Sequence, residues 1–440
     1  MLNLVFVGHL EDPIALGGVG LGNMMISITW MSIGMGLNGA IDTLVSQAYG
    51  DKQYYLWGCY LNRGRIAQLM ILPVIIWYFY SEDFFIRIGQ DPGISKATSI
   101  YLIYMGPGVF AMCQFETVRR FLQSMGKYQL SMYIQLVTWT LHFVWCYLFV
   151  FYLKMGVKGC SIATSITFWL NLIILTGYLW FKKDVVPQES WHFFNRDSFK
   201  NLGSFLKLGS FSLLMLMWEI WAFELTCLLA GWVSANALAA NVILTNIMDF
   251  IFKIPFGMSF AVSNLIGNSL GQGKPNIAYR YWIASVNVMN IISLTIMVVI
   301  VIVRKQVGYI YTSEQDVIDI VSSTIPFFAL GIFFDGIQCV LAGSIRGVGY
   351  QNFGSVISLI SYWFIMLPLW YMLGIVYEFG VIGLWSGLTV GVMVSSSFYS
   401  FPLFCTQWQK FADWAIERIQ KEQAEANEQQ QDGVPLVDES

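Results

Sequence analysis

Two glutamates lie inside an apolar run that is long enough to cross a membrane. Glu219 and Glu224 both belong to residues 213–231, which are otherwise almost entirely apolar. An ionised carboxylate in hydrocarbon is costly, so such residues usually face a bundle interior or a water-filled cavity and take part in function. At about 100° per residue, the five-residue spacing puts the two side chains about 140° apart around a helix. One site therefore cannot hold both equally.

Glu219 is the better candidate for a ligand site. Trp218 and Trp221 flank it, and aromatic rings attract organic cations through cation–π contact. For Glu219 and for Glu224 the alternative is a structural role, in which the carboxylate is paired with a polar neighbour on another helix.

Two further carboxylates lie within apolar runs. Asp335 has no basic residue within a helical turn, so it must be protonated or satisfied from another helix. Asp249 has Lys253 four residues on, and a self-contained ion pair would explain both residues without a transport role. The candidate residues for substrate and proton binding are Glu219, Asp335, Glu224, Trp218 and Trp221, followed by Asp249.

Other chemistry has little support in the sequence. The three histidines lack metal-ligand spacing, and the seven cysteines are scattered without a CxxC pair, so we expect no metal site and no catalytic constellation. His142 is expected to have a hydrogen-bonded structural role. Residues 271–275 resemble a phosphate loop, but the spacing is wrong and Pro275 stands where Ser or Thr would hold magnesium. No cofactor is expected, and an ion gradient is the expected energy source.

The composition indicates an all-α polytopic membrane protein. Hydrophobic residues make up 56% of the chain, charged residues 12%, and the mean hydropathy is +0.60, whereas soluble proteins are about 25% charged. Backbone in lipid must be helical or form a closed barrel, and no alternating barrel pattern is present. Eleven complete spans are predicted, at residues 14–40, 61–80, 97–118, 129–152, 159–181, 208–230, 235–262, 279–303, 317–343, 354–373 and 381–404. In the first of these, Gly18 and Gly22 are expected to allow close helix packing.

The two halves of the chain repeat each other. Gly50, Gln90, Gly126 and Gly156 recur as Gly271, Gln315, Gly349 and Gly380, at offsets of 221, 225, 223 and 224 residues. We therefore expect two parallel six-helix repeats, an arrangement typical of alternating-access carriers. The predicted parts are an N-lobe (1–180), a linker (181–207), a C-lobe (208–404) and a polar tail (405–440). The tail, which is rich in Gln and Glu at 422–431, is expected to be disordered.

The repeat and the charges make two further predictions. In this repeat, the counterpart of the helix that carries Glu219 is a helix before the eleven predicted spans, here called span 1. Only its end is present, as residues 1–8, so span 1 is expected to be truncated, with roughly 20 or more residues encoded upstream in the native transcript. Loops on the linker side carry 14 Lys and Arg residues, Arg346 among them, against 6 on the other side. The linker and the C-terminus are therefore predicted to be cytoplasmic.

Three stretches are similar to a known family. Residues 38–50 (NGAIDTLVSQAYG), 219–224 (EIWAFE) and 335–349 (DGIQCVLAGSIRGVG) resemble the eukaryotic branch of the multidrug and toxic compound extrusion (MATE) family. The resemblance covers about residues 6–409. It implies a twelve-helix, two-lobe carrier that exports organic cations or other amphiphiles in exchange for protons, with Glu219, Glu224 and Asp335 as its acids. The family's usual Glu-Trp-Trp is here Glu219-Ile220-Trp221, and a Glu of animal members is replaced by Asn246.

The mechanism expected from these features is antiport by competition for shared carboxylates. Ionised Glu219 and Asp335 would attract an organic cation, and protonation would release it on the other side of the membrane. Sodium coupling, or export of an anionic or lipid-linked metabolite, is the alternative on the same scaffold. A channel or a membrane-embedded enzyme is less favoured, and the expected partners are a small-molecule substrate, protons and the lipid bilayer, with no nucleic acid.

Overall fold

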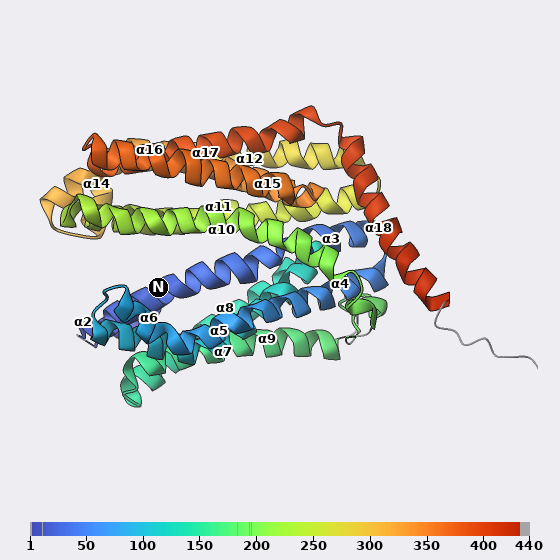
Figure 1. Cartoon of the computed structure of the whole chain (residues 1–440), viewed down its shortest axis with the longest axis horizontal. Coiled ribbons are helices and arrows are strands. Elements are labelled where there is room, and N and C mark those ends of the chain that lie inside the picture. The colour runs from blue at the N-terminus through green and yellow to red at the C-terminus, as the bar shows by residue number, and fades with distance from the viewer. Residues whose placement is uncertain (1, 11, 183, 193, 195, 432–440) are drawn as a thin grey trace, which may run out of the picture. The chain divides into compact units, whose positions relative to one another are not determined.

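The computed structural model describes residues 2–10, 12–182, 184–192, 194 and 196–431. These residues are helical and contain no β-strand, which confirms the all-α fold (Figure 1). Ten helical segments in this part of the chain are long and apolar enough to cross a membrane: Pro13–Gly50, Tyr54–Arg87, Tyr128–Tyr152, Gly156–Phe181, Leu202–Thr226, Asn236–Gly271, Pro275–Ile302, Gln315–Val348, Gln351–Val376 and Gly380–Cys405.

The eleventh expected span, 97–118, is not among these ten. It lies in helix α7 (Pro92–Ser124), whose 33 residues are long enough to cross a membrane. The helix contains many Ser, Thr and Gly residues and ends in a charged stretch with Glu116, Arg119 and Arg120, which lowers its mean hydropathy.

Helix starts in the first half follow simple capping rules. Asp12 and Asp91 each precede a proline and cap the helix that follows, α2 (Pro13–Ile26) and α7. The Asp12 carboxylate accepts hydrogen bonds from the backbone N–H groups of Ile14 and Ala15, and Asp91 does the same for Gly93 and Ile94. Proline suits the first helical position because its missing N–H would have no partner there.

The chain divides into two compact units. The first comprises the described residues up to Ile41 together with Tyr54–Leu213. Its helices are α1 (Leu2–Gly8), α2, a π-helical stretch (Ser27–Met35), α4 (Tyr54–Ala67), a 3₁₀ turn (Gln68–Ile71), α5 (Leu72–Trp77), α6 (Ser81–Arg87), α7, α8 (Tyr128–Cys146), a second π-helical stretch (Tyr147–Tyr152) and α9 (Gly156–Phe181).

Glycines bring α2 and α7 together in the first unit. A Cβ on Gly18 would lie 2.4 Å from the Cβ of Ala97, and one on Gly22 would lie 2.5 Å from Tyr101. The packing role predicted for these glycines is therefore confirmed. Helix α1 also belongs to this unit, because the Asn3 amide donates hydrogen bonds to the Tyr101 and Thr164 hydroxyls.

The linker packs against α4. A Cβ on Gly58 would lie 2.3 Å from the carbonyl oxygen of Ser190, so the two backbones touch. The Asn62 amide donates to the His192 carbonyl at 3.2 Å, and Tyr55 donates to the carboxylate of Asp197 at 2.6 Å. The linker is thus part of the first unit.

The second unit comprises Asp42–Gln53 and the described residues from Leu214 onward. Its helices are the end of α3 (Gly39–Gly50), most of α10 (Leu202–Val233), α11 (Ala235–Gly271), α12 (Pro275–Ile302), α13 (Arg304–Val307), α14 (Gln315–Val348), α15 (Gln351–Ser358), α16 (Leu367–Tyr371), α17 (Gly380–Cys405) and α18 (Trp408–Gln431), with π-helical stretches at Leu359–Met366 and Met372–Val376. Helix α14 is central, since it packs against α11, α12 and α17.

The repeat is visible in the backbone. Left-handed residues recur in pairs at the offsets found in the sequence: Lys52 with Gly273 (φ 60° and 66°), Gly126 with Gly349 (75° and 81°), Lys154 with Glu378 (51° and 56°), and Gly156 with Gly380 (54° and 57°). Positive φ is uncommon for residues other than glycine. Its recurrence shows that corresponding loops turn in the same way in the two halves.

The C-terminal tail differs from the prediction. Residues 408–431 were expected to lie in a polar, disordered tail, but they form α18. Phe411, Ala412, Ala415 and Ile419 are buried on one face of this helix, which packs against α11, α12 and α14. Phe411, Ala415 and Ile419 are four residues apart, as in an amphipathic helix, a pattern hidden by the overall polarity of the segment. Residues 432–440 lie outside the described part.

Candidate functional site

Glu219 and Asp335 lie in one buried cluster of the second unit. Glu219 is on α10 and Asp335 is on α14, and they are 9% and 3% exposed. They are close enough for their charges to interact. The structure therefore brings together the two acids that the sequence ranked first.

The cluster contains polar groups without satisfactory partners. The hydroxyl of Tyr362 and the amide of Gln338 both approach the Glu219 carboxylate. Neither forms a hydrogen bond of good geometry with any described residue, and Oδ1 of Asp335 also has no partner. A buried polar atom left unsatisfied costs about 1–3 kcal/mol. Such a group calls for a specific explanation, such as a bound proton, ion or water.

A narrow cavity adjoins Asp335. It lies between α11, α12 and α14 and is lined by Pro255, Met289, Ser293, Asp335 and Gly336, among others. Its volume is about 10 Å³, which is close to the minimum that one water molecule needs. The hydroxyl of Ser293 has no hydrogen-bond partner among the described residues. The cavity could hold a water molecule or a small ion, but not an organic substrate.

The two glutamates of α10 belong to different clusters. Glu219 interacts with Asp335, whereas Glu224 is half-buried and interacts with Asp249 on α11. Lys253 lies near enough to stabilise charge on Asp249. This arrangement follows from the wide angle between the two side chains around the helix.

The two tryptophans that flank Glu219 have different surroundings. The Trp218 ring packs edge-on against Trp363 at a centroid distance of 5.6 Å, and the Trp218 carbonyl accepts a hydrogen bond from the Trp363 indole. Trp221 is 37% exposed within the second unit. Their role in binding a cation stays a prediction.

The buried arginine that lies near the carboxylates of the second unit was not identified from the sequence. Arg346 was counted as a loop residue, but it is buried in α14 at 3% exposure. Its guanidinium pairs with Asp42 at 3.7 Å, donates to the Ser259 hydroxyl and stacks on Phe260. It also lies within electrostatic range of Glu219. The signal available in the sequence was Asp42 itself, the one charged residue of the apolar segment Pro13–Gly50.

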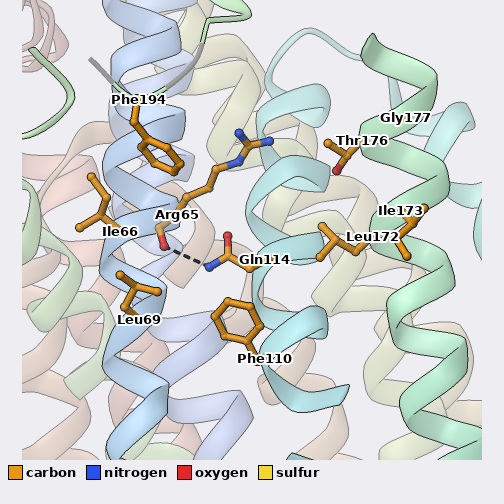
Figure 2. Close-up of a pocket in the computed structure, with 10 residues that line it drawn as sticks. All are labelled: Arg65, Ile66, Leu69, Phe110, Gln114, Leu172, Ile173, Thr176, Gly177 and Phe194. Carbon is orange, nitrogen blue, oxygen red and sulfur yellow. Dashed lines mark hydrogen bonds between the residues drawn. The ribbon is translucent and has the colours of Figure 1, made fainter. Parts of the chain in front are cut away.

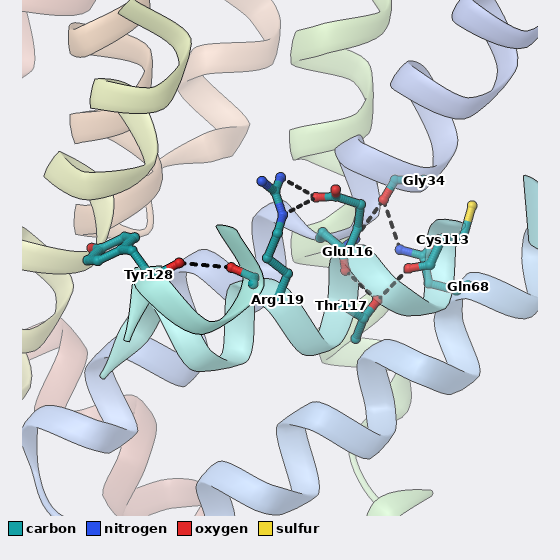
Figure 3. Close-up of polar contacts among 9 residues, drawn as sticks. Gly34, Gln68, Cys113, Glu116, Thr117, Arg119 and Tyr128 are labelled. Carbon is teal, nitrogen blue, oxygen red and sulfur yellow. Dashed lines mark hydrogen bonds and ion pairs between the residues drawn. The ribbon is translucent and has the colours of Figure 1, made fainter. Parts of the chain in front are cut away.

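Glu116 is buried in the first unit, where it forms an ion pair with Arg119 at 2.5 Å, three residues on in α7 (Figure 3). Nearby, Thr117 donates a hydrogen bond to the carbonyl of Cys113. A charge this close to a basic neighbour can be buried because the pair compensates itself.

His142 is hydrogen-bonded, in agreement with its expected structural role. Its Nδ1 lies 2.9 Å from the Thr167 hydroxyl and its Nε2 lies 3.3 Å from the side-chain oxygen of Asn3. The histidine thus ties α8 to α9 and to α1 within the first unit.

Comparison with known proteins identifies the family. The MatE family model matches residues 1–148 and 212–372, which together make up most of the chain. The chain belongs to the MatE family. Protein DETOXIFICATION 16 of Arabidopsis thaliana is 32% identical over 96% of this chain and 86% of its own length. Multidrug and toxin extrusion protein 1 of Mus musculus is 30% identical over 88% of this chain and 68% of its own length.

Solved structures agree with this assignment. The crystal structure of the eukaryotic MATE transporter AtDTX14 matches with a TM-score of 0.89 and 27% identity over 95% of this chain and 93% of that one. The Vibrio cholerae MATE transporter VcmN matches with a TM-score of 0.81 at 18% identity, covering 93% of each chain, which supports the fold alone. This MATE protein is a multi-pass membrane transporter of small molecules and not an enzyme.

Proposed function

We propose that this MATE protein exports organic cations or related xenobiotics in exchange for protons, with Glu219 and Asp335 as the shared carboxylates. The observation that carries the proposal is their burial in one cluster. Neither forms an ion pair with a basic residue in the described part of the chain, although Arg346 is within electrostatic range.

The electrostatics of this cluster favour exchange. Two carboxylates buried side by side cannot both stay ionised without compensating positive charge. A proton or a cation can supply that charge, and binding of one then disfavours binding of the other. This competition is what an antiporter needs, provided that the cluster meets each side of the membrane in turn.

The substrate class rests on the residues near Glu219 and on the relatives. Trp218 and Trp221 offer aromatic faces to an organic cation, since cation–π contact is strongest with tryptophan. The name of the mouse relative refers to multidrug and toxin extrusion. A drug-sized cation cannot enter the cavity beside Asp335, so the proposal assigns that cavity to the coupling ion.

Sodium coupling is the second candidate. Oxygen atoms are the ligands that hard cations prefer, and the unpartnered hydroxyl of Ser293 lies with Asp335 in the same cavity. Imposed gradients separate the two, because a proton-coupled carrier responds to a pH gradient at constant sodium concentration.

The test is flux of a fluorescent organic cation in proteoliposomes. Under an imposed pH gradient, Glu219→Gln is expected to reduce flux to the level of empty liposomes, because the amide keeps the size of the side chain but cannot exchange a proton. Glu314→Gln serves as the control, since Glu314 is exposed just before α14. Proton-driven flux that survives in a folded Glu219→Gln variant would refute the assignment. Flux driven only by a sodium gradient would select the second candidate.

The proposal includes the orientation of the chain across the membrane. The linker and the C-terminus are placed on the cytoplasmic side, because the loops on that side carry most of the basic residues. Cys405 is exposed at the end of α17 and offers a labelling site near this end.

A further inference from the structure

An open groove of about 640 Å³ lies in the first unit, far from the carboxylates in sequence (Figure 2). Its walls come from α4, the 3₁₀ turn that follows it, α7 and α9, with Phe194 of the linker at one end. Most of the lining is apolar, including Leu69, Phe110, Leu172 and Ile173. Leu69 and Ile173 are 46% and 59% exposed, so the groove is open at the surface of the first unit. In a membrane protein such outward-facing apolar side chains meet lipid.

One charge faces this apolar surface. Arg65 extends from α4 toward the side of the groove where Thr176 lies (Figure 2). Arg65 as a whole residue is half-buried, and its guanidinium lies over the Trp191 ring at 5.1 Å from the ring centroid. Within the described residues it forms no ion pair and donates no side-chain hydrogen bond, since the Gln114 contact is made to its backbone carbonyl. A partly buried cation without a counter-charge is costly.

A second polar group also lacks a partner. The Thr176 hydroxyl is buried and forms no hydrogen bond in the described part of the molecule. It lines the groove from α9, beside Gly177, where a Cβ would find no atom within 4 Å. The groove therefore combines open apolar space with a guanidinium and a hydroxyl that can each serve an anion.

We propose that this groove binds an acidic phospholipid, with its phosphate on Arg65 and an acyl chain along Leu69, Phe110 and Ile173. A soluble anion would leave the apolar walls uncovered. A cationic substrate would be repelled by Arg65, since none of the described residues forms an ion pair that would offset its charge. In the proposed orientation Arg65 lies toward the cytoplasmic side, where membranes carry their acidic lipids. Trp191 stands beside the arginine, and tryptophan is enriched at this level of a bilayer.

The corresponding positions of the second repeat lack both the arginine and the glycine of this groove. Helices α9 and α17 have the same length and begin at the paired residues Gly156 and Gly380, so Gly177 corresponds to Phe401. At the offset that relates Gly50 to Gly271, Arg65 corresponds to Val286. The charge and the open space are both replaced by apolar side chains there. Packing common to the two repeats therefore does not account for Arg65.

The experiment compares lipid binding by the full chain in nanodiscs. Nanodiscs of phosphatidylcholine are compared with nanodiscs that also contain brominated phosphatidylserine. The chain has 17 tryptophans, so bound lipid near Trp191 is reported by the part of the tryptophan quenching that is lost in a Trp191→Phe variant. Arg65→Gln should weaken the phosphatidylserine-dependent quenching about tenfold or more, because a charge-assisted contact to phosphate is lost. Gly177→Leu should also weaken it, by filling part of the groove at a position where an added Cβ meets no atom within 4 Å. Arg280→Gln, an exposed arginine on α12, is the control and should not change it.

Further measurements distinguish the alternatives. Arg65→Lys keeps the charge and should retain part of the binding, which guards against loss of fold in Arg65→Gln. Inorganic phosphate added in excess should not compete, since it cannot use the apolar walls, and competition would overturn the lipid assignment. Equal quenching by brominated phosphatidylcholine, or unchanged binding in folded Arg65→Gln and Gly177→Leu variants, would also refute the proposal. None of these readouts requires transport, so the outcome is independent of the proposed function.

Discussion

Gly343 in α14 lies against the backbone of α11, and replacing it with alanine tests how closely these helices pack. A Cβ at this position would lie 2.3 Å from the carbonyl oxygen of Ser259 and 2.9 Å from its carbonyl carbon. Because these are backbone atoms, no change of rotamer can relieve the clash. Overpacking of this kind costs about 1–3 kcal/mol. The gain in helix propensity from Gly to Ala, about 1 kcal/mol, opposes it.

Gly257→Ala is the matched control. Gly257 lies in the middle of α11, is exposed, and would have no atom within 4 Å of an added Cβ. The propensity gain is common to both variants and cancels when they are compared. Gly343→Ala should therefore be about 1–3 kcal/mol less stable than Gly257→Ala.

The difference can be measured by reversible unfolding in mixed detergent micelles, followed by circular dichroism. A substrate-flux assay on the same samples would show whether pushing α11 and α14 apart also disturbs Asp335, which is two turns earlier in α14. Equal stability of the two variants would show that the helices are not in backbone contact at Gly343.

Two further predictions concern the charged residues of the second unit. Asp335→Asn should abolish proton-driven flux while Asp249→Asn should mainly change stability, because Lys253 stabilises the Asp249 charge; flux lost in a fully stable Asp249→Asn variant would reverse this ranking. Arg346→Met should destabilise the protein by about 3–5 kcal/mol, because it leaves Asp42 buried without its partner. Adding Asp42→Asn to Arg346→Met should recover part of this loss in a double-mutant cycle, whereas strictly additive effects would show that the two side chains do not interact.

Several features could be predicted from the sequence because they depend on local pattern. Long apolar runs identify membrane helices, and carboxylates inside them are rare enough to single out Glu219 and Asp335. The similar offsets of glycine pairs such as Gly126 and Gly349 predicted the repeat, and both residues have left-handed backbone conformations.

Other features depend on contacts between distant segments and left no local pattern. Tyr362 and Gln338 approach Glu219 from two other elements, and neither residue type is unusual in its own stretch. Arg346 was counted with the loops because it lies near the end of its helix, although inside the protein it pairs with Asp42 and donates a hydrogen bond to Ser259. The lobe boundaries predicted from the repeat remain a prediction. They put residues 42–53 in the N-lobe, whereas the contacts between residues group Asp42–Gln53 with the second unit.

The assignment of Asp42–Gln53 to the second unit affects how the protein is made. The Thr43 hydroxyl donates a hydrogen bond to the Arg346 carbonyl across 303 residues of sequence. Gln47 likewise donates to the Gly347 carbonyl, and Gly271 lies against the Gln47 backbone. At a synthesis rate of about 5–20 residues per second, the partners of this segment leave the ribosome roughly 11–60 s after it does. During that interval Asp42 must stay in the translocon, in the lipid interface or with a chaperone, without its arginine.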